Sequence, residues 1–298
     1  MQTKVHSDGG AFSPWEGVDG FLVINMDSGT ERFSSFMERT GKYLPADKFE
    51  RVSAVAGREL PSYGRAPWFT IRTGDRSSFW GGTGGCTLSH RKAILRARER
   101  GWRNVLIFED DVILEHPDVA GIAVAEALSH VDGKYMLYLG YNLPTPYGQR
   151  RQTLNCGMEL WITEGVLAAH AYLVPCSMYD TLLDLMPESE EEVWRWLSWY
   201  KAVDLFYMKY VPMLTRAQMF VINPMLCVQA DGVSQIGGNQ EDIESRISRT
   251  GPRACYGLHA VCRRFMRPLR HLKLKLNSFR TYLRARRNGL PGPRKCKK

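Results

Sequence analysis

An apolar run that ends in three consecutive carboxylates constrains this chain more than any other stretch. Residues 105–108 (VLIF) are continuously apolar, which is typical of a strand covered on both faces, and Glu109, Asp110 and Asp111 follow directly. Side chains of a strand alternate between its two faces, so we expect Glu109 and Asp111 to project together and Asp110 to point the other way. Two adjacent carboxylates repel each other unless a cation lies between them, and Mn²⁺ or Mg²⁺ takes such oxygen ligands. The triplet therefore predicts a metal site at Glu109 and Asp111, with a solvated acidic turn as the alternative.

The residues before this strand predict a helix. A Gly-rich turn at 81–85 precedes a stretch with apolar residues on one side. We expect this helix to begin near Thr87 or Ser89, where a hydroxyl can cap free N–H groups, and to end before Gly101. Ser89 and His90 would then lie at the helix N-terminus, where the N–H groups and the dipole favour an anion such as a phosphate. Alternatively, Ser89 only caps the helix and His90 is a polar surface residue.

Two further strands precede this helix and complete the pattern of an open α/β fold. Residues 20–27 form the first, with Asn25 near its end, and residues 49–57 form the second, which runs into a glycine turn. Ligands of such folds bind outside the carboxyl ends of the strands. A nucleotide base would lie near Asn25, and Arg32 in the following turn could reach its phosphates. A first strand with a polar turn and a surface arginine fits these residues equally well.

Together, these motifs resemble glycosyltransferase family 25, which includes lipopolysaccharide β-galactosyltransferases and collagen galactosyltransferase domains. The resemblance covers about residues 20–238 and rests on five segments in family order: VINMD (23–27), GCTLSHRKA (85–93), FEDDV (108–112), HAYL (170–173) and VDLF (203–206). It implies a GT-A-type α/β fold, in which a Rossmann-like half binds a nucleotide-sugar donor and a mixed half binds the acceptor. The carboxylate triplet would then be the D-x-D-type motif that holds a metal ion and the diphosphate of a UDP-sugar.

The resemblance also implies roles for single residues on the donor side. Small residues at Ala54 and Gly57 would let a base or ribose approach the backbone closely, although a simple strand-to-turn transition explains them equally well. Asp110 would face the ribose. The full set implied for donor binding is Asn25, Arg32, Ala54, Gly57, Ser89, His90, Asp110, His170, Gln229 and Ser234.

Three residues of this set, His170, Gln229 and Ser234, come late in the chain, and each has an alternative structural explanation. His170 would face the site, although a lone His in an apolar strand is more often a satisfied core residue. The segment that holds Gln229 and Ser234 would close over the pyrophosphate or supply a late metal ligand, with a surface turn as the alternative. This segment has no histidine, so the third protein ligand of the metal is open.

The acceptor side offers one candidate catalytic residue. Transfer with inversion, which the resemblance implies, needs a carboxylate near the acceptor hydroxyl to accept its proton, and Asp204 lies in the matching VDLF segment. The alternative for Asp204 is a helix N-cap. Residues 141–160 are turn-rich and are expected to form part of an acceptor loop. The Trp-rich helix expected at 190–200 belongs to the core, or stacks under a sugar.

The charge of the chain divides it into an acidic body and a basic tail. The net charge is +9, yet residues 245–298 hold 17 Lys and Arg and no Asp or Glu. Five apolar residues from Leu269 to Leu283 recur three or four positions apart, which predicts a basic amphipathic helix. Such a helix commonly lies on an anionic membrane surface, and the alternative is packing on the body. No aromatic residues interleave with the charges as a nucleic-acid platform would require.

The remaining features fix the domain organisation and the expected compartment. We expect a flexible leader at 1–19, a GT-A domain at 20–244 and the basic tail at 245–298. The opening residues lack the apolar core of a signal peptide, and no apolar run is long enough to span a membrane. Seven scattered cysteines without a C-x-x-C pair are typical of free thiols in a reducing cytosol. The expected location is therefore the cytoplasm, peripherally on the cytosolic membrane face.

These observations predict a metal-dependent glycosyltransferase. It would use Mn²⁺ or Mg²⁺ and transfer a hexose from a UDP-sugar to a hydroxyl of a glycan acceptor such as lipooligosaccharide. Galactose is the leading candidate for the hexose. Two alternatives stay open: a catalytically inactive glycan- or membrane-binding relative, and a metal-dependent nucleotidyl- or phosphotransferase.

Overall fold

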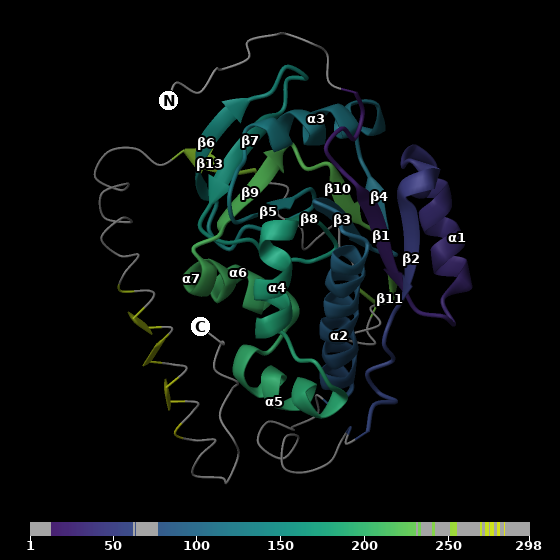
Figure 1. The fold of residues 1–298 in the computed structure, drawn as a ribbon, viewed down its shortest axis with the longest axis vertical. Coiled ribbons are helices and arrows are strands. Elements are labelled where there is room, and N and C mark those ends of the chain that lie inside the picture. The colour runs from purple at the N-terminus through teal and green to yellow at the C-terminus, as the bar shows by residue number, and fades with distance from the viewer. Residues whose placement is uncertain are drawn as a thin grey trace.

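The computed structural model is an α/β protein built on one large sheet (Figure 1). It describes residues 13–61, 63, 77–230, 232–233, 240–241 and 251–254, and positions 269, 272, 273, 275, 276, 279, 280 and 283. Among these residues, no helix is long and apolar enough to cross a membrane.

The sheet has nine strands in the order β13-β6-β7-β9-β5-β8-β3-β1-β2. Its strands are β1 (Gly20–Asn25), β2 (Phe49–Ser53), β3 (Asn104–Glu109), β5 (Tyr135–Tyr138), β6 (Tyr147–Thr153), β7 (Glu159–Thr163), β8 (Ala171–Pro175), β9 (Gln218–Asn223) and β13 (Arg253–Ala254). β2, β1 and β3 are mutually parallel, β8 is antiparallel to β3 and β5, and β7 is antiparallel to both β6 and β9. The expected division into a Rossmann-like parallel half and a mixed half is confirmed.

Helices cover both faces of the sheet, which explains why its central strands are apolar throughout. Leu22, Val105 and Ile107 belong to one buried cluster with α2 (Ser77–Glu99), α4 (Cys176–Leu185), α5 (Glu190–Tyr200) and α6 (Val203–Lys209). Their sequence neighbours Phe21 and Leu106 belong to a second cluster with α1 (Thr30–Arg39) and α3 (Pro117–Ser129). Alternate side chains therefore enter opposite cores, as strand geometry requires.

Short elements complete the described fold. They are the 3-10 helices η1 (Gly41–Tyr43) and η2 (Ala46–Lys48), the helix α7 (Val211–Thr215), and the strands β4 (Val112–Leu114), β10 (Cys227–Gln229), β11 (Gly232–Val233) and β12 (Gln240–Glu241). β10 pairs with β4 directly after the carboxylate triplet, with Gln229 opposite Val112. This pairing brings a late segment of the chain to the end of β3.

The helix before β3 begins earlier than the sequence predicts. α2 begins at Ser77, so the predicted Gly-rich turn at 81–85 is helical. A Cβ on Gly85 would lie 2.2 Å from the Val55 carbonyl oxygen, and one on Gly57 would lie 1.8 Å from the Gly81 carbonyl oxygen. The glycines are therefore needed because the backbone after β2 lies directly against the helix, not because the chain turns there. The predicted end is confirmed, since Gly101 has a φ of +67° after the last helical turn.

The domain boundaries also differ from the predicted ones. Residues 13–19, predicted as part of a flexible leader, pack on the domain: Trp15 and Val18 are buried, and the Trp15 indole donates to the Tyr43 carbonyl oxygen at 3.2 Å. β13 joins β6 and so continues the sheet past the predicted boundary at residue 244. Residues 141–160, predicted as a turn-rich loop, instead contain β6 and the start of β7. Residues 1–12 lie outside the described part of the chain.

Candidate functional site

A cavity of about 450 Å³ lies at the carboxyl ends of β1, β2 and β3, where an open α/β sheet binds its ligands. Seven predicted site residues line it, together with a cysteine that the sequence did not single out: Asn25, Ala54, Gly57, Ser89, His90, Glu109, Asp110 and Cys86. The predicted donor-site residues before β4 therefore converge on one hollow, with the exception of Arg32.

Arg32 holds the middle carboxylate of the triplet. Its guanidinium donates to Asp110 through Nε at 2.9 Å and through a second, shorter contact, and Asn25 Nδ2 donates to the other Asp110 oxygen at 2.7 Å. Arg32 also lies 3.5 Å from Asp111 Oδ2. Asp110 is thus fully satisfied by protein partners, and the contact of Arg32 with a donor phosphate stays a prediction.

The predicted alternation of the triplet is wrong beyond its first residue. β3 ends at Glu109, so Asp110 and Asp111 lie in the turn before β4 and both reach Arg32. Glu109 and Asp111 nevertheless interact, because burial and then the charge of Glu109 raise the pKa of the Asp111 carboxyl.

Asp111 is the incompletely satisfied member of the triplet. Its Oδ1 is buried and has no hydrogen-bond partner among the described residues, while Gln229 Nε2 donates to Oδ2 at 3.4 Å. A buried carboxylate with a free oxygen beside a second carboxylate is costly unless a cation or a proton joins it. Gln229 therefore reaches the predicted metal site, whereas Ser234 lies outside the described residues.

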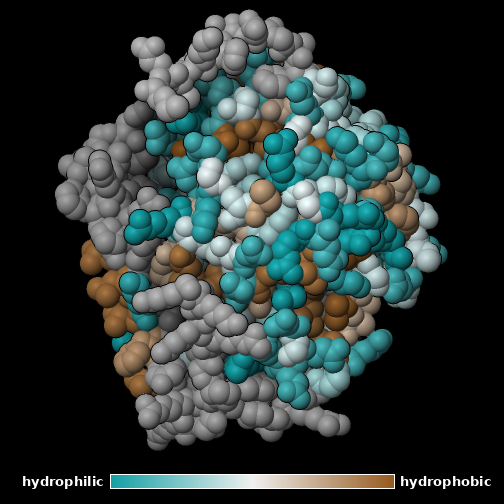
Figure 2. Space-filling view, viewed as in Figure 1, coloured by the Kyte–Doolittle hydropathy of each residue, from teal (hydrophilic) through white to brown (hydrophobic). Residues whose placement is uncertain are grey.

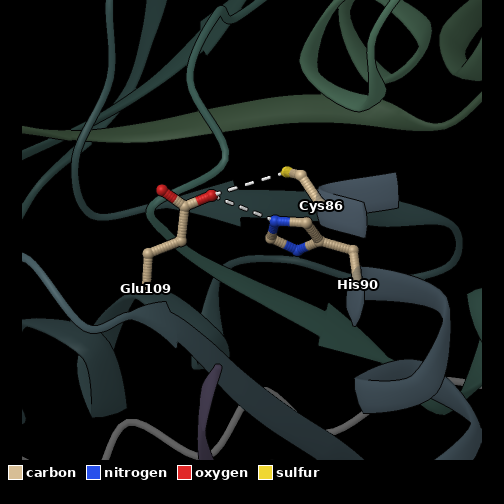
Figure 3. A group of neighbouring side chains, drawn as sticks. All are labelled: Cys86, His90 and Glu109. Carbon is tan, nitrogen blue, oxygen red and sulfur yellow. Dashed lines mark hydrogen bonds and ion pairs between the residues drawn. The ribbon is translucent and has the colours of Figure 1, made fainter. Parts of the chain in front are cut away.

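Glu109 is the carboxylate that faces the α2 side of the cavity (Figure 3). His90 Nε2 lies 3.2 Å from Glu109 Oε1, and Cys86 Sγ donates to the same oxygen at 3.9 Å. Burial opposes ionisation, but the hydrogen bond and charge of His90 outweigh it and lower the pKa of Glu109. Burial and the charge of Glu109 raise the pKa of Cys86 well above its usual value, so this residue is a thiol and not a nucleophilic thiolate.

The predicted helix-start roles of Ser89 and His90 are wrong, because α2 begins well before them. Ser89 Oγ accepts from the Val55 N–H at 2.8 Å and donates to the Gly85 carbonyl oxygen at 2.6 Å, so it fixes the segment after β2 against the helix. His90 is buried, and its Nδ1 lies 2.8 Å from the Tyr172 hydroxyl. Free helix N–H groups are therefore absent at both positions, and any contact with a donor must come from the side chains.

His170 and Asp204 approach the same centre from the mixed half of the sheet. His170 is 3% exposed and packs against Gly140, and burial lowers its pKa although the Glu109 charge opposes the shift. Burial also raises the pKa of Asp204, and the charge of Glu109 adds to that shift. The helix cap at this point is Ala202, and Asp204 accepts from the Leu205 N–H at 2.7 Å, so Asp204 is not an N-cap.

The Trp-rich helix belongs to the core. Trp194, Trp196 and Trp199 of α5 are all buried, and Trp194 packs over Gly84 of α2. Trp194 thus supports the helix that carries Cys86 and His90, and the burial of all three rings favours a core role over stacking on a sugar.

Sequence reasoning missed two residues of this site. Cys86 stands one helical turn before His90, and this i, i+4 spacing was the available signal. Tyr172 is visible in the sequence only as part of an apolar strand, so its hydroxyl contact with His90 could not be found without the fold.

Comparison with known proteins agrees with this geometry. The model of glycosyltransferase family 25 (LPS biosynthesis protein) matches residues 18–152, a range that holds the cavity lining and the triplet. No curated protein matches the chain. His170, Asp204 and Gln229 lie beyond the family match, so their roles rest on the structure and on the motifs alone.

Two solved structures are weakly similar. A mannose-1-phosphate geranyltransferase from Thermus thermophilus shares 10% identity at a TM-score of 0.36, with 69% of this chain and 74% of that one covered. A glycosyltransferase involved in the glycosylation of the major capsid of PBCV-1 shares 14% identity at a TM-score of 0.38, with 72% and 94% covered. Both similarities are too weak to carry an argument. The family model covers 135 of the 298 residues, just under half of the chain, and the match over residues 18–152 supports a glycosyltransferase of family 25.

Proposed function

We propose that this protein transfers a hexose, galactose first among the candidates, from a UDP-sugar to a hydroxyl of a glycan such as lipooligosaccharide, with inversion and with Mn²⁺ or Mg²⁺. The observation that carries the proposal is the buried Oδ1 of Asp111, which has no hydrogen-bond partner among the described residues and directly follows Glu109 and Asp110, two residues that line the cavity. A cation at this place would lie where the diphosphate of a donor in the cavity reaches the end of β3.

The residues fit a hard divalent cation. Glu109 and Asp111 would supply carboxylate oxygens, and Gln229, whose Nε2 donates to Asp111 Oδ2, would supply its amide oxygen once the amide turns over. The bound ion would supply charge neutralisation for the departing diphosphate. The raised pKa of Asp111 supports this assignment, because burial and the charge of Glu109 outweigh the nearby positive charge of Arg32.

Other residues of the chain would bind and orient the donor. Ala54 and Gly57 leave the cavity wall open to a ribose or base, and Arg32 with Asn25 fixes the turn that carries the triplet. Asp110 is already held by these two residues, so its role toward a ribose would require one of its hydrogen bonds to be shared.

We assign the proton transfer to Asp204. Burial raises the pKa of its carboxyl, which makes it a stronger base than an exposed aspartate, and the charge of Glu109 adds to this shift. It would accept the proton of the acceptor hydroxyl while that oxygen attacks the anomeric carbon from the face opposite the diphosphate. His170, buried next to the same centre, would shape the wall between donor and acceptor.

Release of UDP from a panel of UDP-sugars tests the proposal. We expect slow, Mn²⁺-dependent turnover of one donor that EDTA abolishes and that Asp111→Ala loses. Asp180→Asn is the matched control, because this carboxylate is 84% exposed on α4 and should not affect turnover. Turnover that survives both EDTA and Asp111→Ala would refute the metal assignment, and donor binding without turnover would favour the inactive binding relative.

The tail supports a lipid-linked acceptor. Its described residues are helical, and Leu269, Leu272, Leu276, Phe279 and Leu283 are 48–55% exposed. In Figure 2 apolar side chains form a brown group at the left edge, where Figure 1 draws the yellow tail segment. An apolar stripe among 17 basic and no acidic residues suits the cytosolic face of an anionic membrane.

Sedimentation with vesicles tests this part separately. We expect binding to vesicles that contain anionic lipid, no binding to neutral vesicles, and loss of binding when Leu272 and Leu276 are both changed to Ser. Equal binding to both vesicle types would refute an electrostatic membrane contact, whatever the donor assay shows.

A further inference from the structure

Three side chains on the α2 side of the cavity form a cluster that the hexosyl transfer does not require as a set. Cys86 and His90 lie one helical turn apart on α2 and point toward Glu109 at the end of β3 (Figure 3). Their ligand atoms all lie within 4.8 Å of one another, and the three residues line the cavity together.

Two of the three distances between these atoms lie near those of a tetrahedral zinc site, and the third, between Cys86 Sγ and His90 Nε2, is within 4.8 Å. With a Zn–S bond of about 2.3 Å and Zn–N and Zn–O bonds near 2.0 Å, a tetrahedral ion holds N and O about 3.3 Å apart and S and O about 3.5 Å apart. The structure has 3.2 Å between His90 Nε2 and Glu109 Oε1, and 3.9 Å between Cys86 Sγ and the same oxygen. Small side-chain movements would therefore admit the ion.

The donor set selects a borderline cation over a hard one. A sulfur, an imidazole nitrogen and one carboxylate oxygen suit Zn²⁺, whereas Mn²⁺ and Mg²⁺ prefer all-oxygen sites. Tyr172 completes the arrangement, because its hydroxyl can accept from His90 Nδ1 at 2.8 Å and so leaves the Nε2 lone pair free to face the ion. Tyr172 is in turn 3.4 Å from the Tyr207 hydroxyl, which restrains it.

We propose that Cys86, His90 and Glu109 form a second metal site, for Zn²⁺ or a cation of similar softness, with its fourth position open to the cavity. Binding releases two protons to solvent, the thiol proton of Cys86 and the Nε2 proton that His90 donates to Glu109, and it leaves one imidazole proton on Nδ1 facing Tyr172. Three protein ligands and one open position are the pattern of an exchangeable zinc site, not of a closed structural one.

The two metal sites would share Glu109, and this consequence rests on the function proposed above. A zinc ion bound to Oε1 of Glu109 draws that carboxylate toward α2 and places a second positive charge close to the Asp111 site. Occupation by Zn²⁺ and by Mn²⁺ would therefore be mutually unfavourable, and Zn²⁺ would inhibit a Mn²⁺-dependent reaction.

Zinc binding to the protein without a sugar nucleotide tests the site itself. The background carries serine at Cys156, Cys176, Cys255, Cys262 and Cys296, which removes the cysteines other than Cys86 and the buried Cys227. Competition with a chromophoric chelator then measures Zn²⁺ affinity. We expect one tight site that Cys86→Ser and His90→Gln each weaken at least about 100-fold, and that Tyr172→Phe weakens by about 10- to 100-fold, the range typical of a lost outer-shell partner.

The matched control is Cys227→Ser in the same background, which should leave the affinity unchanged. Thermal melts in EDTA identify any variant that fails to fold. If either Cys86→Ser or His90→Gln fails to fold, the zinc affinity of the other variant decides whether the site exists. Zinc affinity that neither Cys86→Ser nor His90→Gln changes would overturn the proposal, as would the absence of a tight site in the background. The zinc measurement contains no sugar nucleotide, so a failed UDP-release assay does not change its interpretation. A failed zinc measurement likewise leaves the proposed glycosyl transfer untouched.

Discussion

The buried carboxyl of Asp111 predicts that the metal-free protein loses stability as pH rises. Burial and the neighbouring Glu109 raise the pKa of Asp111 from 3.8 to about 7. The folded state therefore keeps a proton that the unfolded chain has already released between these two values, so the stabilising contribution is full at low pH and is lost as pH rises to about 7. Asp111→Asn removes this titration and keeps the shape of the side chain.

The magnitude follows from the shift in pKa. Between pH 5 and about pH 7 the Asp111 carboxyl is protonated in the folded state and ionised in the unfolded chain, and above about pH 7 it is ionised in both. The two states therefore differ by one proton over about two pH units, which at 1.36 kcal/mol per unit amounts to about 2 to 3 kcal/mol. We expect Asp111→Asn to gain that much in unfolding free energy relative to the wild type over this range. The side chain of Asp111 is only 19% exposed, so solvent screening removes little of the effect.

Urea denaturation in EDTA at pH 5, 6, 7 and 8.5 measures this difference. Asp180→Asn is the control, since the same chemical change at an 84% exposed carboxylate should give a difference that does not vary with pH. Added Mn²⁺ should stabilise the wild type at pH 8.5 and not Asp111→Asn, because only the native carboxylate gains from the ion. A stability difference between Asp111→Asn and wild type that is the same at all four pH values would refute the reasoning.

Three further predictions concern single side chains. Arg32→Gln leaves the buried Asp110 with one partner and should cost about 2 kcal/mol in urea denaturation, whereas Arg98→Gln, in an exposed pair with Asp180, should cost less than about 0.5 kcal/mol. Asp204→Asn should lower kcat about 10²- to 10⁴-fold with little change in donor KM, and an unchanged kcat would exclude it as the base. Gly85→Ala puts a Cβ 2.2 Å from a backbone oxygen and should cost about 1 to 3 kcal/mol in a melting experiment; an unchanged melting temperature would mean that the helix can move away from the segment after β2.

The parallel half of the fold could be predicted because its signals are local. Apolar runs at 20–25 and 105–108 are long enough to specify buried strands, and Gly101 ends the intervening helix at the predicted place. The start of α2 could not be predicted in this way. The glycines at 81–85 are locally typical of a turn, yet they lie in a helix. The close approach of the Val55 carbonyl oxygen, a contact between distant segments, explains why glycine is needed there.

The candidate site likewise has features that one segment of sequence predicts and features that depend on contacts between distant segments. The types of residue at 109–111 indicate a metal site, but which carboxylate is free depends on Arg32 and Asn25, which bind Asp110 across more than 75 positions of sequence. His90 lines the candidate cavity, but its contacts are with Glu109 and Tyr172 and not with a helix N-terminus, so its predicted role in donor binding stays a prediction. Partner choice among buried polar groups is a property of the packed fold, and no pattern in one segment contains it.

The polar groups at the end of β3 are unequally satisfied, and this inequality is the strongest argument for their function. Asp110 has its full set of protein partners and can serve the fold, while Asp111 keeps a buried oxygen without one. A folded protein tolerates such a cost where a ligand later removes it, because binding energy then offsets what folding lost. Glu109 differs from both Asp110 and Asp111 in the kind of partners that bind it. Its Oε1 bonds both His90 and Cys86, and a zinc ion on these three side chains would replace both hydrogen bonds without leaving either partner unpaired.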